Sequence, residues 1–179
     1  MVAAIALILC CTIGGTLAWL KTSTTPVTNT FTVGDINIEL KETENLDLKM
    51  VPGNKIFKDP KVTVKTDSEA CWLFVKVGES ANLKDFIEYN VNTADGEWKL
   101  VPDETHVYYR EVDAATAKAG ATYSILTGDE VKVLDTVTKT MLNGLEKATY
   151  PTLTFVAYAV QSDNISDVNT AWTEAQKAD

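Results

Sequence analysis

The chain has 179 residues, of which 45% are hydrophobic and 23% are charged, so its composition is that of a globular domain and excludes an intrinsically disordered protein. Its 25 acidic residues outnumber its 16 basic residues and give a formal net charge of −9. Because phosphate backbones and anionic lipid headgroups repel such a surface, the sequence argues against binding to nucleic acid or to a membrane surface.

The chain begins with an apolar leader. No charged residue occurs from Met1 to Ala18, and the apolar run ends at a glycine pair followed by the small residues Thr16 and Ala18. This pattern predicts a secretory signal peptide, residues 1–18, cleaved between Ala18 and Trp19. The run is shorter than the ~20 residues of a membrane-spanning helix, and an uncleaved N-terminal anchor is the alternative. No lysine or arginine precedes the run, so we expect the basic residues of the signal peptide to lie upstream of Met1.

Cleavage would leave a single cysteine. Cys10 and Cys11 lie in the leader, so Cys71 would have no partner for an intramolecular disulfide. Cys71 stands in an apolar strand pattern, which predicts a buried and inert thiol. A reactive or intermolecular thiol is the alternative.

Strand patterns begin directly after the leader. The polar and β-branched stretch 22–26 ends in Pro26, which excludes a helix, so we expect it to be extended. Apolar residues alternate in one phase over 27–33 and in the opposite phase over 36–40. The phase changes at Gly34-Asp35, which predicts two strand segments joined by a glycine kink.

The middle of the chain continues this pattern. Residues 41–60 form a polar connection with a turn at Pro52-Gly53-Asn54. Residues 71–77 are apolar on both faces, which predicts a central strand. We expect one helical turn within 83–89, strands at 62–64 and 106–112, and a hairpin of 89–91 with 97–101 around Ala94-Asp95-Gly96.

The last third mixes strands with helices. Alternating segments at 123–126 and 130–134 flank Gly128-Asp129, which predicts a hairpin. Apolar spacings of three and four predict helices at 137–148, capped by Asp135 or Thr136, and at 168–175. The continuously apolar run 153–160 predicts a fully buried strand. About eight short strands in all predict an all-β protein, an antiparallel β-sandwich domain spanning 32–179 with a few short covering helices.

Catalytic and metal-binding chemistry is scarce. His106 is the only histidine, so a two-histidine zinc motif is absent and no other histidine is available as a base for a serine nucleophile. We therefore expect no enzyme, no cofactor and no catalytic or metal site, with His106 a structural or exposed strand residue. A loose calcium site built from loop aspartates such as Asp47, Asp59 or Asp129 stays open as an alternative.

The four tryptophans have different expected roles. We expect Trp72 in the core, Trp98 half exposed after its hairpin, and Trp172 on the apolar face of the last helix. Cleavage after Ala18 would make Trp19 the new N-terminal residue. Because a large aromatic ring is costly to leave in water, Trp19 either packs back on its own domain or anchors this terminus in a neighbour.

Several segments resemble a known family. Gly14-Gly15-Thr16-Leu17-Ala18-Trp19-Leu20, followed by Asn29-Thr30-Phe31-Thr32-Val33-Gly34-Asp35-Ile36, is similar to exported proteins of the TasA and camelysin group, which a SipW-type signal peptidase processes in Gram-positive bacteria. The runs at 60–64, 71–77 and 150–155 also look like this family. The most specific part is the first 40 residues.

The resemblance implies a jelly-roll-like β-sandwich, secreted to the extracellular matrix or cell surface as a subunit of biofilm-matrix fibres. It implies that the segment 19–31 adds as a strand to the next subunit, with contacts from Trp19, Leu20, Val27, Asn29 and Phe31. Its partners would be copies of itself, other matrix proteins and the signal peptidase, with membrane contact only during export. Some members are assigned to a metallopeptidase family, but this sequence has no zinc motif to match.

Three functions therefore remain to be compared. The first is a fibre subunit that assembles head to tail. The second is a monomeric surface-adhesion or ligand-binding module on the same fold. A secreted metallopeptidase is the third, with the least support from the residues.

Overall fold

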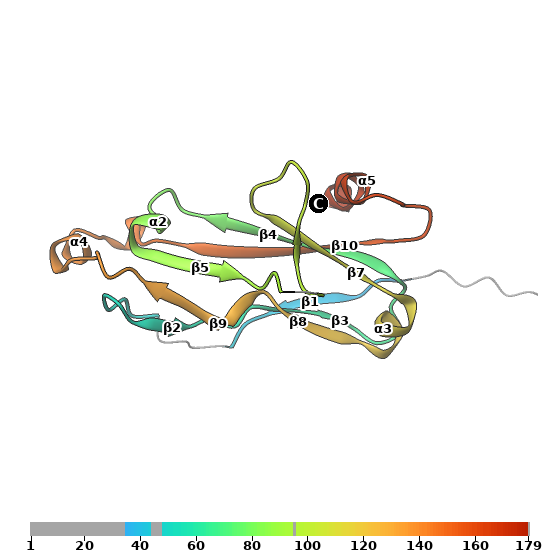
Figure 1. The fold of residues 1–179 in the computed structure, drawn as a ribbon, viewed down its shortest axis with the longest axis horizontal. Coiled ribbons are helices and arrows are strands. Elements are labelled where there is room, and N and C mark those ends of the chain that lie inside the picture. Colours follow the sequence, from blue (N-terminus) through green and yellow to red (C-terminus); the bar gives the residue numbers. More distant parts are fainter. Residues whose placement is uncertain (1–34, 44–47, 95, 179) are drawn as a thin grey trace, which may run out of the picture. The chain divides into compact units, whose positions relative to one another are not determined.

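The computed structural model of the chain describes residues 35–43, 48–94 and 96–178 (Figure 1). The described residues belong to one compact unit, Gly34–Asp179. The leader, the cleavage position at Ala18 and Trp19, and the predicted contact residues Leu20, Val27, Asn29 and Phe31 lie outside the described residues. In the described part, no helix has the length and apolar character needed to cross a membrane.

The described strands form three antiparallel sheets. One sheet has the order β1-β3-β8, made of β1 (Ile38–Lys41), β3 (Lys61–Val64) and β8 (Ala121–Ser124). The largest has the order β10-β4-β7-β6, made of β10 (Leu153–Gln161), β4 (Cys71–Glu79), β7 (Val107–Val112) and β6 (Lys99–Leu100). The third has the order β2-β9-β5, made of β2 (Lys55–Phe57), β9 (Leu126–Val133) and β5 (Ile87–Val91).

Short helices connect the strands. They are α2 (Leu83–Phe86), α3 (Ala114–Ala119), α4 (Lys139–Asn143) and α5 (Val168–Ala175), with 3-10 turns η1 (Lys147–Thr149) and η2 (Gln176–Ala178). Side chains of Asp113, Thr138 and Asp167 accept a bond from a backbone N–H three residues on, which caps the first turns of α3, α4 and α5. The sequence thus placed the last helix correctly but misplaced the cap of α4, which is Thr138 instead of Asp135 or Thr136.

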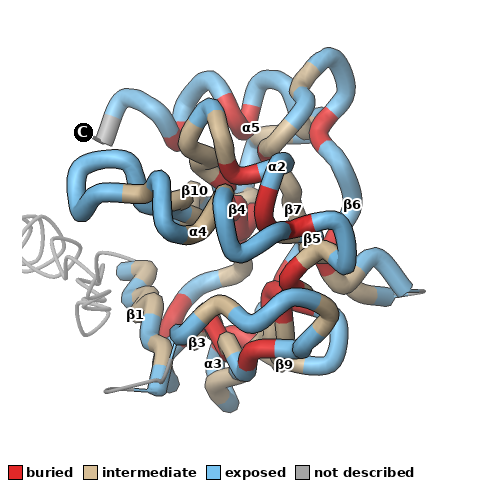
Figure 2. Tube along the Cα trace, turned by 90° about the vertical axis from the view of Figure 1, so that its left-hand side faces the viewer, coloured by how far each residue is buried: buried red, intermediate tan, exposed pale blue. Residues whose placement is uncertain are grey.

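The core lies mainly between β4 and the sheet of β3. Val62 and Val64 of β3 and Leu73 and Val75 of β4 are all 0% exposed and belong to one cluster. On the opposite face of β4, Trp72 and Phe74 pack beneath Trp172 of α5. A third cluster lies between β9, α2 and α4. Buried residues are concentrated on these strands, and exposed residues on the loops (Figure 2).

A mostly-β antiparallel fold with short helices is confirmed. β4 is a central strand, as predicted, because it pairs with β10 on one side and β7 on the other. The predicted strands at 62–64 and 106–112, the turn at Pro52-Gly53-Asn54 and the helical turn before Ile87 are also present. Of the two segments predicted around Gly34, the second corresponds to β1 and the first lies outside the described residues.

Both predicted hairpins are wrong. The turn at 92–98 is closed by bonds from Glu97 N to Ala94 O and from Trp98 N to Asn92 O, but β5 then pairs with β9 and β6 with β7. Trp98 is 1% exposed and not half exposed as predicted. Its ring is buried where the chain passes from the sheet of β5 to the sheet of β6. Gly128 and Asp129 have φ of 70° and 52° and form a bulge inside β9, because left-handed residues suit a bulge as well as a turn.

Two further differences concern exposure and pairing. The predicted polar connection 41–60 contains β2, a three-residue strand that pairs with β9. The strand at 153–160 exists as β10 but is not fully buried, since it lies at a sheet edge and Val156 is 45% exposed. A continuous apolar run therefore does not distinguish an edge strand from a central one.

Candidate functional site

The most unusual feature of the described part is the open edge of β10. Over nine residues β10 pairs with β4 alone, in continuous register from Leu153 opposite Glu79 to Gln161 opposite Cys71. The strand Leu-Thr-Phe-Val-Ala-Tyr-Ala-Val-Gln has no charge, no proline and no bulge. Natural proteins normally protect sheet edges with charged residues, prolines or bulges, because an open edge strand pairs with other chains. The other described edge strands have five residues or fewer.

The hydrogen-bond pattern shows which backbone groups face outward from this edge. Just beyond the two ends of β10, Ser80 N donates to Thr152 O and Ser162 N donates to Ala70 O, each at 3.0 Å. Both bonds belong to the same ladder, and bonded positions alternate in an antiparallel pair. Even-numbered residues of β10 therefore bond to β4, and the N–H and C=O groups of Phe155, Ala157 and Ala159 point away from it.

Side chains along this edge leave the core partly uncovered. Phe155, Ala157 and Ala159 pack against the main core cluster, as do Ile38 and Leu40 of β1, yet all five are only half-buried. The neighbouring inner strands β3 and β4 contribute residues to the same cluster that are fully buried. The core residues are thus fully buried along its centre and half-buried along the side where β1 and β10 lie next to each other.

An apolar groove of about 640 Å³ opens at the start of β10. Its walls include residues of β2, β9, α4 and the start of β10, among them Ile56, Val131, Leu142, Tyr150 and Leu153. Two large exposed apolar side chains, Leu48 and Tyr150, line the groove. Exposed apolar surface that gathers in one place is typical of an interaction site.

The charge at the groove is compensated within the subunit. Lys58 is 12% exposed, and its Nζ donates to both carboxylate oxygens of Glu42 at 2.9 and 3.0 Å. The same ammonium lies 5.7 Å from the ring centroid of Phe155. Because Glu42 neutralises the Lys58 ammonium, this lysine does not make the groove a binding site for anions.

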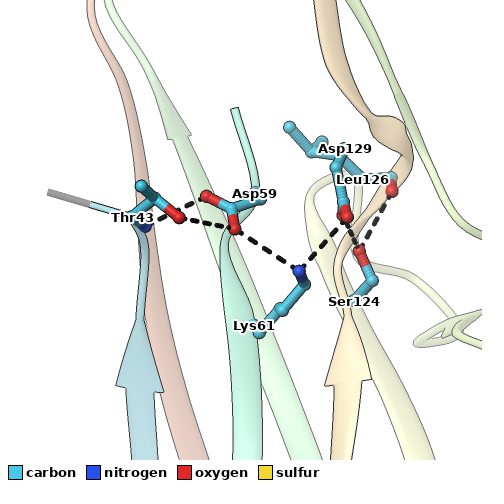
Figure 3. Close-up of polar contacts among 6 residues, drawn as sticks. All are labelled: Thr43, Asp59, Lys61, Ser124, Leu126 and Asp129. Carbon is cyan, nitrogen blue, oxygen red and sulfur yellow. Dashed lines mark hydrogen bonds and ion pairs between the residues drawn. The ribbon is translucent and has the colours of Figure 1, made fainter. Parts of the chain in front are cut away.

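Two of the three aspartates considered for calcium lie on either side of a lysine (Figure 3). Lys61 Nζ is 3.4 Å from Asp59 Oδ2 and 3.2 Å from Asp129 Oδ2. Thr43 donates to Asp59 through its N–H at 3.0 Å and its hydroxyl at 2.9 Å, while the Ser124 hydroxyl donates to Asp129. The ammonium thus occupies the place between the carboxylates that a cation would take. Asp47 lies outside the described residues, and no cluster of three or more metal-ligating side chains occurs in the described part.

This network shifts the pKa values of Asp59 and Lys61. The Thr43 N–H, followed by the Thr43 hydroxyl and Lys61, lowers the pKa of Asp59 against the opposing effect of burial. The hydrogen bond to Asp129 raises the pKa of Lys61. Both groups therefore stay charged at neutral pH, and the network joins the β1–β3–β8 sheet to the bulge of β9.

Replacing Asp59 with alanine should lower the free energy of unfolding by about 1–3 kcal/mol at neutral pH, because the buried carboxylate loses its hydrogen bonds from Thr43 and its ion pair with Lys61. Since the folded-state pKa of Asp59 is lowered, its contribution is complete above the unfolded-state pKa of ~3.9 and disappears as pH falls below it. Urea unfolding between neutral pH and pH 3 should show a smaller difference between wild type and variant at the acid end. Asp85→Ala, at an exposed position in α2, is the control and should change stability little; an equal loss at every pH would contradict the assignment.

A second, polar cleft of about 520 Å³ contains the single histidine. Glu79, whose side chain is 11% exposed, accepts a hydrogen bond from Tyr89 Oη at 2.5 Å and lies 3.2 Å from Lys84 Nζ and 3.6 Å from His106 Nε2. Burial, and then the bond to Glu79, raises the pKa of Tyr89, and burial raises that of Tyr108. Both phenols remain protonated, so the Glu79 carboxylate lies among hydrogen-bond donors, and Glu88 also lines the cleft. His106 is 39% exposed and precedes β7.

Cys71 is the only cysteine among the described residues, and it is buried as predicted. Its side chain is 0% exposed, and burial raises the pKa of the thiol to about 11. Because the thiolate is the reactive form, this thiol is inert in the folded subunit at neutral pH.

No family model, curated protein or solved structure matches this chain. Sequence reasoning missed both the β10 edge and the groove. The only signal for the edge is the pair of polar side chains Thr154 and Tyr158 at alternate positions of an otherwise apolar run. The groove carries no local signal, because its walls come from segments up to about a hundred residues apart in the sequence.

Proposed function

We propose that this chain is an exported structural subunit without enzymatic activity, which assembles head to tail into fibres of the extracellular matrix of a Gram-positive bacterium. In this proposal, SipW-type processing at Ala18-Trp19 frees the segment 19–31, and that segment adds as a strand to β10 of the next subunit. The fold would be the jelly-roll-like β-sandwich of the TasA and camelysin group, which the sequence resembles. Other matrix proteins would be further partners.

The open edge of β10 is the observation that carries this proposal. Strand addition draws affinity from main-chain hydrogen bonds and specificity from alternate side chains. The outward N–H and C=O groups of Phe155, Ala157 and Ala159 provide the first requirement. The half-covered core beside them provides the second, because an added strand would complete the burial of these side chains. A head-to-tail contact of this kind does not close on itself and produces open filaments.

Side chains and charge of the segment 19–31 suit this role. Trp19, Leu20, Val27 and Phe31 offer apolar side chains, and Asn29 lies between the last two. All 25 acidic residues follow Gly34, whereas Lys21 is the only charged side chain before it. A segment that carries only positive charge is attracted to an acidic neighbour, which favours association between subunits over long distances.

The packing of the sheets supports the proposed sandwich. The sheets of β3 and β4 bury their facing side chains in one shared cluster, and α5 covers the opposite face of β4. Two antiparallel sheets with a common core and a helix as cover fit a sandwich architecture.

Deleting residues 19–30 should abolish filaments while leaving a folded monomer, because the deletion removes the added strand and no described contact. Electron microscopy of the secreted protein measures assembly, and circular dichroism with sedimentation measures folding and size. A variant with residues 19–30 replaced by a glycine–serine sequence of equal length is the control for linker length, and it should also fail to assemble. Normal filaments from either variant would refute strand addition.

The groove supports a second candidate function, a monomeric adhesion or ligand-binding module. Its volume of about 640 Å³ is in the range of small-molecule sites, and its walls are largely apolar. The two functions differ in oligomeric state. A secreted protein that stays monomeric at high concentration and binds an apolar fluorescent probe with 1:1 stoichiometry would favour the second.

A further inference from the structure

We propose that the polar cleft beside His106 binds a neutral saccharide, which its uncharged hydroxyl and amide side chains hold by hydrogen bonds. The cleft has a volume of about 520 Å³, and small-molecule sites occupy about 300–1,000 Å³. Ile87 is the one residue that lines both this cleft and the apolar groove. The proposal therefore concerns a second site, and it does not depend on assembly into fibres.

The cleft lies between two sheets. Glu79 ends β4 and Tyr108 belongs to β7, both in the largest sheet, whereas Tyr89 belongs to β5 of the third sheet. Tyr89 and Tyr108 also pack against the main core cluster, which holds the two rings in place. The backbone before β7 is held as well, because Val77 N donates to His106 O at 2.8 Å. Much of the wall is thus built on strands, which hold a site more precisely than loops do.

The charged side chains of the cleft already have partners of opposite charge. Lys84 Nζ lies 3.2 Å from Glu79 Oε2, and Lys132 Nζ lies 3.4 Å from Glu88 Oε1. The Glu79 carboxylate also accepts the hydrogen bond from Tyr89. A charged ligand would have to compete with these ion pairs, whereas a neutral ligand leaves them intact. The cleft therefore favours uncharged ligands over anions and cations.

Four uncharged polar side chains of the wall are available to a ligand. They make no hydrogen bond with another described residue, and they belong to Asn90, Thr93, Thr105 and Tyr108. The first three are exposed and Tyr108 is half-buried, so a molecule in the cleft can reach them. Asn90 stands where the register between β5 and β9 shifts. Such irregularities are frequent beside functional sites, where they redirect a side chain.

The chemistry of these groups matches that of a sugar. A hydroxyl or a side-chain amide both donates and accepts hydrogen bonds, as the hydroxyls of a saccharide do. Tyr89 and Tyr108 add half-buried aromatic rings, whose apolar surface suits the C–H face of a sugar ring. A wholly apolar ligand would remove the polar groups from water without replacing their hydrogen bonds, which costs free energy. A neutral ligand with many hydroxyl groups meets both requirements.

An extended peptide is the other neutral ligand that carries many donors and acceptors. Peptides that add to a sheet pair with the main chain of an edge strand, as proposed for β10. In the cleft, the four groups without a partner are side chains, and they come from β5, from β7 and from residues beside these strands. Because β5 and β7 belong to different sheets, this arrangement suits a compact ring better than an extended chain.

Saccharide binding by the secreted protein tests the proposal. The probes are an array of neutral oligosaccharides and, in calorimetric titrations, the disaccharides maltose, cellobiose and N,N′-diacetylchitobiose. We expect 1:1 binding of a neutral saccharide. Tyr108→Phe and Thr105→Val each remove one hydroxyl with little change in shape, so each should weaken this binding about two- to tenfold, the effect of one lost hydrogen bond. The triple variant Asn90→Ala/Thr105→Val/Tyr108→Phe should show no measurable binding.

Tyr150→Phe is the matched control. It removes a phenol that lines the groove and not the cleft, so it should bind the saccharide as the wild type does. Thermal melting followed by circular dichroism shows that each variant is folded. Tyr108→Phe keeps its ring in the core, and Thr105 is exposed, so these two single variants test the site even if the triple variant is destabilised.

Each contrary result overturns a different part of the proposal. No binding of any neutral oligosaccharide by the wild type would refute the saccharide assignment, and tighter binding of a uronic acid disaccharide would refute the preference for a neutral ligand. Binding that Tyr150→Phe weakens and Tyr108→Phe leaves unchanged would place the ligand in the apolar groove. Binding of trialanine in place of the saccharides, weakened by Tyr108→Phe, would show that the cleft accepts a peptide.

Discussion

Replacing Ala157 with proline should abolish fibre formation while the subunit stays folded. Ala157 is at the centre of β10, and its N–H points to the open edge and not to β4. Proline is tolerated in an edge strand where the missing N–H faces outward, so the β4–β10 ladder should survive. The added strand loses its hydrogen bond from residue 157, at the centre of β10, and its backbone clashes with the pyrrolidine ring. The loss of at least about 1.4 kcal/mol per contact would raise the critical concentration for assembly about tenfold or more.

Two variants at neighbouring positions control this result. Ala157→Ser keeps the outward N–H and should assemble normally. Val156→Pro removes an N–H that bonds to β4 and leaves a carbonyl of β4 unpaired, so it should lower the free energy of unfolding by about 1–3 kcal/mol and affect the monomer first. Sedimentation measures the critical concentration, and thermal melting followed by circular dichroism measures folding. Filaments of Ala157→Pro at the wild-type concentration would mean that β10 is not the receiving strand.

Replacing Trp98 with alanine should lower the free energy of unfolding by about 3–5 kcal/mol, the usual cost of removing a buried tryptophan ring. Trp98 is 1% exposed, and its Nε1 donates to Ser124 O at 2.9 Å. Its ring packs edge-on against Tyr123 at 6.4 Å and lies 5.6 Å from the guanidinium of Arg110. The loss therefore combines a cavity with an unpaired carbonyl oxygen. Urea unfolding at neutral pH measures it.

The neighbouring position Leu100 offers a matched comparison. It is also a large apolar residue of the same segment, but it is 49% exposed, so Leu100→Ala should change stability by less than about 0.5 kcal/mol. Trp98→Phe keeps most of the apolar contact and loses the bond to Ser124, so its effect should lie between the two. A loss below about 1 kcal/mol for Trp98→Ala would show that the surrounding residues collapse into the space.

Local patterns predicted most strands but not their neighbours. β4 and β10 are both continuously apolar in sequence, and only pairing partners make the first central and the second an edge. Those partners are set by contacts between distant segments, which periodicity does not contain. The exposure of Trp98 was predicted wrongly for the same reason, since its contacts with Ser124 and Arg110 join positions that are distant in the sequence.

The Gly128-Asp129 pair correctly predicted a left-handed backbone, but the hairpin turn inferred from it is wrong. Gly128 and Asp129 do adopt left-handed conformations, but the partners of β9 on both sides make them a bulge instead of a turn. The aspartates considered for calcium show the same limit. The sequence identifies Asp59 and Asp129 as loop acids, whereas the pairing of β3 with β8 and the bulge of β9 bring Lys61 between them. The predicted contact residues Trp19 to Phe31 lie outside the described residues, so their role stays a prediction.

The burial of Cys71 gives this protein an internal reporter of unfolding. In a processed chain without the leader, Cys71 is the only thiol, and its position opposite Gln161 on one side and Val112 on the other shields it by both neighbouring strands. Its side chain is packed in the main core cluster, so a thiol reagent reaches it only when that core opens, and the labelling rate follows this opening. Because an added strand would lie directly on β10, the same thiol registers how far assembly slows that opening, without any introduced probe.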